Sequence, residues 1–138
     1  MKLVNIVFFE GGKAHEAFIR NGLKIRTEIL KHVNKEEAGK AAEAVGGKLL
    51  DPPPLEDPSI DWAVAFEPIR NLKIVYLMRR NEPEFPDEIQ VLYDVEGLPF
   101  RVPAEDVADF TILYANALIY AVKNVVGRKD IPGIGSYL

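Results

Sequence analysis

The sequence predicts an α+β domain, in which an antiparallel sheet of about four or five strands packs against a long C-terminal helix and N-terminal helices. Two apolar segments, residues 72–78 and 89–95, flank a turn rich in charge and proline, which is typical of an antiparallel hairpin. Apolar residues recur with a helical period near both ends of the chain. The 138 residues, 48% of them hydrophobic, suit one domain spanning residues 1–138.

A strand and a long helix are predicted to come first. Residues 3–9, LVNIVFF, have the length and the β-branched and aromatic content of a buried strand, and Gly11 and Gly12 end it. Over residues 13–33, apolar positions recur every three or four residues, as in an amphipathic helix. The positions that define this stripe are Phe18, Gly22, Ile25, Ile29 and Val33.

A second helix and a proline-rich loop follow. Asn34 and Glu37 form a capping-box pattern, in which each side chain accepts a backbone N–H of the other residue. The helix that begins there is predicted to end at Gly46 and Gly47. Residues 49–59 contain four of the ten prolines. Because proline lacks a backbone donor and blocks helix formation, this segment is predicted to be an extended loop.

Three strands are predicted to form the centre of the sheet. In residues 62–66, WAVAF, large residues alternate with alanines, and we expect a helix to pack against the flat alanine face. Residues 72–78 are apolar on both faces, as in a central strand. Residues 89–95 alternate between apolar and polar, so that one face is solvated except at Leu92. A further short strand is predicted at residues 100–102.

The hairpin turn at residues 80–87 is dense in carboxylates. These groups could form an acid–base pair or bind a hard cation such as magnesium or calcium. Surface ion pairs with Arg79 and Arg80 are the simpler interpretation, because no histidine or second carboxylate cluster stands at ligand spacing nearby. Phe85, which stands between two prolines, is predicted to insert into the core as an anchor.

Residues 103–126 are predicted to form one long helix. Pro103 at its first position presets the backbone, and the acidic residues that follow place negative charge near the positive end of the helix dipole. Between Phe110 and Val122 there is no charged residue. We therefore expect this helix to be buried within the domain or at a subunit contact. Residues 127–138 are predicted to be an irregular tail.

Short motifs in and around the hairpin are similar to those of a known family. An acidic turn, Glu84-Phe85-Pro86, is followed by a strand that ends in Tyr93-Asp94 and then by the helix from Pro103. In this arrangement the chain, over roughly residues 14–122, resembles a family of uncharacterised prokaryotic domains of unknown function. That family has no established activity, so the resemblance implies no reaction, cofactor or site residue.

Composition excludes several classes of function. The chain has no cysteine, which excludes disulfides, thiolate metal sites, iron–sulfur clusters and cysteine nucleophiles. With 17 basic and 21 acidic residues it has no positive field for nucleic acid or a membrane surface, and we expect neither as a partner. A cysteine-free chain without a signal-peptide pattern is expected in the cytoplasm. Its many charges and few methionines fit a heat-adapted source.

No cofactor or metal site is predicted. Gly11 and Gly12 precede Lys13 between a strand and a helix, but this loop is too short to cradle a phosphate and lacks the required hydroxyl residue. His15 and His32 lie too far apart on one helix to bind a metal together. Catalytic residues are therefore unknown, and catalysis is not the function that the sequence favours.

The uncharged C-terminal helix carries most of the candidate site residues. Asn116 is nearly its only strongly polar group, so it either faces a ligand cavity or is a core amide bonded to backbone or to a tyrosine hydroxyl. Tyr114 and Tyr120 lie on two different sides of the helix. Together with Arg79, these residues are the candidate ligand or interface residues. The side of the helix that the sheet leaves uncovered needs a partner, either the N-terminal helix or a second copy of the chain.

The function that the sequence favours is a noncatalytic binding or assembly module. It would act as a homo-oligomer or as an accessory subunit. Its expected partner is a second copy of the chain, in a homodimer, or another protein. The alternative is a small-molecule-binding protein or enzyme with a pocket between the sheet and the C-terminal helix. Tyrosines, Asn116 and Arg79 would line that pocket.

Overall fold

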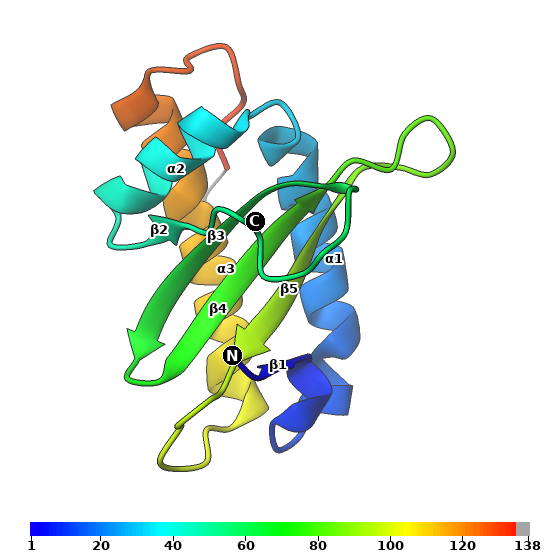
Figure 1. Cartoon of the computed structure of the whole chain (residues 1–138), viewed down its shortest axis with the longest axis vertical. Coiled ribbons are helices and arrows are strands. Elements are labelled where there is room, and N and C mark those ends of the chain that lie inside the picture. Colours follow the sequence, from blue (N-terminus) through cyan, green and yellow to red (C-terminus); the bar gives the residue numbers. More distant parts are fainter. Residues whose placement is uncertain (135–138) are drawn as a thin grey trace.

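The computed structural model describes residues 1–134, which form a five-stranded antiparallel sheet with helices on one face (Figure 1). The predicted α+β fold class, with its N-terminal helices and long C-terminal helix, is confirmed. The strands are β1 (Leu3–Val4), β2 (Lys48–Leu49), β3 (Ile60–Ile69), β4 (Leu72–Arg79) and β5 (Glu88–Asp94), in the sheet order β1-β5-β4-β3-β2. The helices are α1 (Gly12–Leu30), α2 (Lys35–Ala44) and α3 (Ala104–Ala121).

Strand β4 lies at the centre of the sheet, as its apolar sequence predicts. Its even-numbered residues, such as Ile74 and Tyr76, pack toward the helices, while Val75 and Leu77 pack on the opposite face. Both neighbouring strands are antiparallel to it, with Tyr76 opposite Val64 of β3 and Val91 of β5. The four residues named here are fully buried, so the middle of β4 is covered on both faces, and only Lys73 and Arg79 near its ends are partly exposed.

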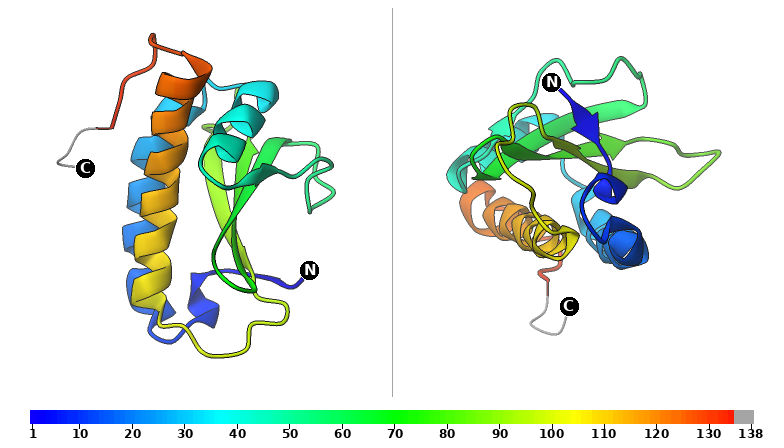
Figure 2. Two further views of the ribbon diagram at one scale, coloured as in Figure 1. Left: turned by 90° about the vertical axis from the view of Figure 1, so that its left-hand side faces the viewer. Right: turned by 90° about the horizontal axis from the view of Figure 1, so that it is seen from below.

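Helices α1 and α3 form a layer against one face of the sheet (Figure 2). They run parallel, because Gly22 and Arg26 of α1 contact Ile112 and Asn116 of α3 in the same order. Helix α2 packs over β2 and β3. Its predicted capping box is confirmed: Glu37 N–H donates to Asn34 Oδ1 at 2.9 Å, and Asn34 N–H donates to Glu37 Oε1 at 3.1 Å.

The opposite face of the sheet is covered by the proline-rich loop and not by a helix (Figure 2). Trp62, on the large-residue face of β3, points to the helical layer, whereas Ala63 and Ala65 lie under the loop. Leu50 and Leu55 of the loop pack against the sheet there. The prediction of a helix on the alanine face is therefore wrong. A flat surface of small side chains accommodates an extended chain equally well.

The two terminal segments predicted as short strands differ from expectation. Within residues 3–9, only Leu3 and Val4 form a strand, because the Asn5 side chain accepts the Val7 N–H at 2.9 Å and starts a 3₁₀ helix over Ile6–Phe8. Residues 100–102 form no strand; the chain there leads into Pro103, which caps α3 and pairs with Glu10 in an isolated bridge.

The hairpin tip extends beyond the sheet, and Phe85 at its end is 68% exposed. The prediction that Phe85 anchors the core is therefore wrong. Asp87 organises the tip instead, because its Oδ1 accepts the backbone N–H groups of Asn81 at 2.8 Å and Glu82 at 3.1 Å. These bonds close the turn before Phe85 can reach back to the sheet.

After α3 the helix widens into a π-helical turn, Val122–Val126, and stops at Gly127 in the left-handed conformation with φ of 90°. Ile131 and Ile134 of the following irregular segment are buried. The rest of the predicted tail, residues 135–138, lies outside the described residues. Within residues 1–134, no helix has both the length and the apolar composition that crossing a membrane requires.

Candidate functional site on the outer helical face

The side of α1 and α3 that faces away from the sheet carries large apolar side chains in contact with solvent. Phe18 is 53% exposed and Ile25 44% on α1, while Leu113 is 60% and Tyr120 48% exposed on α3. Five exposed positions on this side of α1 are uncharged, namely Ala14, Ala17, Phe18, Asn21 and Ile25, and the charged Glu28 follows them near the end of the helix. We call this surface, defined by Phe18, Ile25, Leu113 and Tyr120, the outer helical face.

The two helices approach each other closely at the centre of this face. A Cβ atom on Gly22 would come within 2.6 Å of Ile112 Cδ1, so glycine at this position permits the contact. Helix α1 thus covers the Ile112 side of α3. Leu113 and Tyr120 nevertheless remain exposed, so α1 covers only part of the side of α3 that the sheet leaves open.

A buried arginine lies in the seam between the helices. Arg26 is only 2% exposed; its Nε donates to Asn116 Oδ1 at 2.7 Å and its Nη1 to Gly22 O at 2.9 Å. Within the part of the chain that the structure describes, its Nη2 has no hydrogen-bond partner. Burial lowers the pKa of Arg26, because desolvation disfavours the charged guanidinium.

Arg26 was not among the residues that the sequence singled out, although a signal for it exists. It stands in the same helical stripe as three buried residues, at positions i+7, i+3 and i−4 from Ile19, Leu23 and Leu30. A charged residue in an apolar stripe requires a polar partner from elsewhere. Asn116, 90 positions away, is that partner.

The four candidate site residues do not meet at one place. Asn116 and Tyr120 lie one helical turn apart beside Arg26, on the outer side of α3. Tyr114 lies on another side of α3, with its ring 5.1 Å from that of Phe66. Arg79 faces away from the helices, where its Nη1 donates to Asp57 Oδ2 at 2.5 Å and its Nε to Gln90 Oε1 at 2.7 Å.

The layer between the sheet and α3 is filled by side chains. Tyr76 donates its hydroxyl to Thr111 O at 2.6 Å, and the Tyr93 hydroxyl lies 2.7 Å from Thr111 Oγ1. Burial raises the pKa of Tyr76, and it raises that of Tyr93 to about 12. Both hydroxyls are therefore buried and bonded to Thr111 of α3.

The charged groups of the hairpin are engaged in ion pairs. Arg79 pairs with Asp57, and it holds the pKa of that carboxyl at about 2 by its hydrogen bond. Arg80 pairs with Asp61 at 3.0 Å and with Asp87 at 3.5 Å. Within residues 1–134 no group of three or more metal-ligating side chains comes together. These ion pairs hold the hairpin against the neighbouring loop and strand.

Comparisons of the chain with family models, with curated proteins and with solved structures found no match. The resemblance to a family of uncharacterised prokaryotic domains therefore stays a prediction. Any assignment of function depends on the surfaces described above.

Proposed function

We propose that the chain is a noncatalytic assembly module that forms a homodimer through the outer helical face. The observation that carries this proposal is the exposure of Phe18, Ile25, Leu113 and Tyr120 on two adjacent helices, with uncharged residues between them. Contiguous apolar surface of this kind is costly in water and is typical of protein contact sites. A location in the cytoplasm of a prokaryote belongs to the same proposal and is supported by the absence of cysteine.

The distribution of charge along α3 favours a second copy as the partner. Asp109 lies seven residues before Asn116 and Lys123 seven residues after it, so each is about 10 Å away along the axis at 1.5 Å per residue. A two-fold axis through the level of Asn116, perpendicular to the helices, would place Asp109 opposite Lys123 of the partner subunit. The same operation sets the parallel helix pair of one subunit antiparallel to that of the other, which opposes their dipoles.

The first experiment measures mass in solution. Size-exclusion chromatography with light scattering, at micromolar concentration, is expected to give twice the 15.4 kDa of one chain. The double variant F18E/L113E is expected to be monomeric, because it places two carboxylates in the centre of the contact. Both residues are exposed, so the fold is retained. Phe85→Glu is the control, since Phe85 is also exposed, at 68%, but lies outside the outer helical face, and this variant is expected to remain dimeric.

A charge exchange tests the two-fold arrangement itself. Asp109→Lys or Lys123→Asp alone should raise the dissociation constant of the dimer by about two- to fivefold, the size expected for an exposed ion pair. The combined exchange D109K/K123D should restore it. A wild-type chain that is monomeric at every accessible concentration, or an F18E/L113E variant that dimerises normally, would overturn the proposal.

A further inference from the structure

Strand β5 has an outer edge that the rest of the sheet covers only at one end. Strand β1 pairs with it at two positions, Leu3 opposite Asp94 and Val4 opposite Tyr93. The chain then leaves the sheet in the 3₁₀ helix that Asn5 caps. From Glu88 to Leu92, no strand within residues 1–134 pairs with this side of β5. The sheet is thus open along most of one strand.

The backbone of Val91 points outward along this open edge. The Ile89 N–H donates to Thr27 Oγ1 of α1 at 3.1 Å, and the Val95 N–H donates to Lys2 O at 3.0 Å. Both bonds are on the outer side of β5. Because backbone groups alternate in direction along a strand, the N–H and C=O of Val91 point to the same side. They lie between these two satisfied ends and have no pairing strand there within the described residues.

A cleft of about 660 Å³ surrounds this edge. Its wall on the helical side of the sheet contains the apolar Ile6, Ile19 and Leu23, with Glu16 and Arg20 of α1 beside them. Its wall on the other side is polar and includes Asp57, Ser59, Arg79 and Gln90. A cavity that is walled from both faces of a sheet must run along the edge of that sheet. Ile89 and Val91 of β5 accordingly form its floor.

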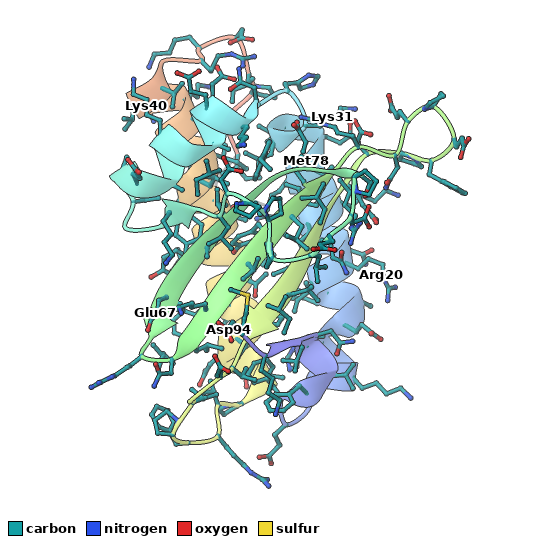
Figure 3. The ribbon with its side chains drawn as sticks, viewed as in Figure 1. Arg20, Lys31, Lys40, Glu67, Met78 and Asp94 are labelled. Carbon is teal, nitrogen blue, oxygen red and sulfur yellow. The ribbon has the colours of Figure 1, made fainter. Side chains whose placement is uncertain are left out.

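The cleft continues toward the hairpin tip. A second hollow of about 590 Å³ shares Leu23 and Ile89 with the first and is bounded by the exposed Phe85. Arg20 of α1 lines both hollows; Figure 3 shows it on the side of the sheet where β5 forms the edge. Between Ile89, whose N–H bonds to Thr27, and Tyr93, which pairs with β1, the open part of β5 is residues 90–92, or about 10 Å at 3.3 Å per residue. That length suits a short extended peptide.

We propose that this edge binds an extended segment of a partner protein, which adds a strand to β5 and alternates apolar with acidic residues. The added strand would bond to the N–H and C=O of Val91. Because successive side chains of a strand point to opposite faces, every second residue would contact Ile19 and Leu23. This site is separate from the outer helical face and does not depend on dimerisation.

The acidic preference follows from the charges that line the cleft. Arg79 donates from Nε and Nη1 to groups of its own chain, which leaves Nη2 for a peptide carboxylate. Arg20 is exposed and forms no ion pair within residues 1–134. Three carboxylates also line the cleft: Asp57 is paired with Arg79, Glu16 stands four residues before Arg20 on α1, and Glu88 is the first residue of β5. The peptide residues between those that contact Ile19 and Leu23 would face the polar wall, where Asp57 is already paired with Arg79 and Arg79 Nη2 is the cationic donor that a carboxylate would meet. Arg20 lies on the α1 wall and adds positive charge beside the peptide backbone.

The test uses three fluorescein-labelled hexapeptides with the wild-type chain: VEVEVE, the charge-reversed VKVKVK and the proline-interrupted VEPEVE. Fluorescence polarisation is expected to show saturable binding of VEVEVE and about tenfold weaker binding of the other two. Val91→Pro is expected to weaken VEVEVE to the same extent, since proline removes the outward N–H and is tolerated at a strand edge. The proline-interrupted peptide makes the same test if this variant fails to fold.

Amide exchange measured by NMR locates the contact. Saturating VEVEVE is expected to slow exchange of the Val91 amide by about tenfold. The amide of Ala42 in α2, a helix that lines neither hollow, serves as the unaffected reference. Equal affinity for VEVEVE and VEPEVE, unchanged Val91 exchange, or no binding at about 1 mM peptide overturns strand addition. Equal affinity for VKVKVK overturns the acidic preference.

Discussion

The hydrogen bonds between Thr111 and the sheet allow a quantitative prediction about how α3 is held in place. Thr111 is fully buried, and its Oγ1 lies 2.7 Å from Val107 O and 2.7 Å from the Tyr93 hydroxyl. A threonine hydroxyl has one proton, which it donates to Val107 O. The Tyr93 hydroxyl must therefore be the donor in the other bond. Thr111→Val preserves the shape of the side chain but removes the only acceptor for Tyr93 that the structure shows.

The expected loss of stability depends on which buried hydroxyl group is left without a hydrogen-bond partner. In Thr111→Val the fully buried Tyr93 hydroxyl has no acceptor, so the free energy of unfolding should fall by about 1–3 kcal/mol. Tyr93→Phe removes the donor, and Thr111 keeps its bond to Val107 O, so the loss should be about 0.5–1.5 kcal/mol. The double variant T111V/Y93F has no unpaired buried hydroxyl. It should therefore be destabilised by clearly less than the sum of the two single changes.

Urea unfolding provides the assay, because the single tryptophan, Trp62, is buried and bonded through its indole N–H to Val33 O at 2.9 Å. Its fluorescence reports the contact between the sheet and the helical layer. All four proteins are compared at one concentration, so that any dimerisation contributes equally. A Thr111→Val variant as stable as the wild type, or a double variant that loses the full sum, would refute the reasoning.

Two further predictions concern pH and packing. Burial raises the pKa of Tyr93 from 10 to about 12. The neutral hydroxyl therefore contributes its full stabilisation below pH 10, and this contribution, at most about 3 kcal/mol, is lost as the pH rises to 12. Urea midpoints should fall over this pH range, and they should fall less in Tyr93→Phe. Gly47→Ala should cost about 1–3 kcal/mol, because its new Cβ would lie 2.5 Å from Phe66 Cε1 and 2.7 Å from Ala65 O. Gly39→Ala is its control, with no new contact below 3.3 Å; equal thermal midpoints for these two variants would contradict the steric argument.

The parts of the fold that the sequence predicts correctly are those fixed by residues close together in the chain. The capping box of α2 needs only Asn34 and Glu37, and the structure contains both of its bonds. The central position of β4 follows from its apolar residues on both faces, since only a strand covered on both sides can be so composed. In each case the deciding information lies within about ten residues.

The errors arise where a distant contact or one side chain overrides a local pattern. Residues 3–9 have the composition of a strand, but the Asn5 side chain bonds to the backbone and starts a 3₁₀ helix instead. The alanine face of β3 fits either a helix or a loop, and the sequence of the strand does not distinguish them. Whether Phe85 reaches the core depends on the length of the hairpin beyond the sheet, which its composition does not encode.

The candidate surfaces could be predicted only in part for the same reason. The absence of charge in α3 directs attention to that helix, and the structure shows Leu113 and Tyr120 exposed on it. The complementary half of the surface, Phe18 and Ile25, belongs to a helix whose stripe looks like an ordinary core pattern. The open edge of β5 depends on how soon β1 ends. That length is set by Asn5, which lies far from β5 in the sequence.

Both proposed surfaces include α1, yet they occupy different sides of it. At 100° per residue, Phe18 and Leu23 are separated by 500°, or 140° around the helix axis. A second copy on the outer helical face would therefore leave the cleft beside β5 uncovered, and each dimer would present two clefts. It follows that F18E/L113E should bind VEVEVE as the wild type does, and Val91→Pro should keep the wild-type mass. Loss of both properties in either variant would indicate a general loss of structure, so the failure of one proposal can be distinguished from the failure of the other.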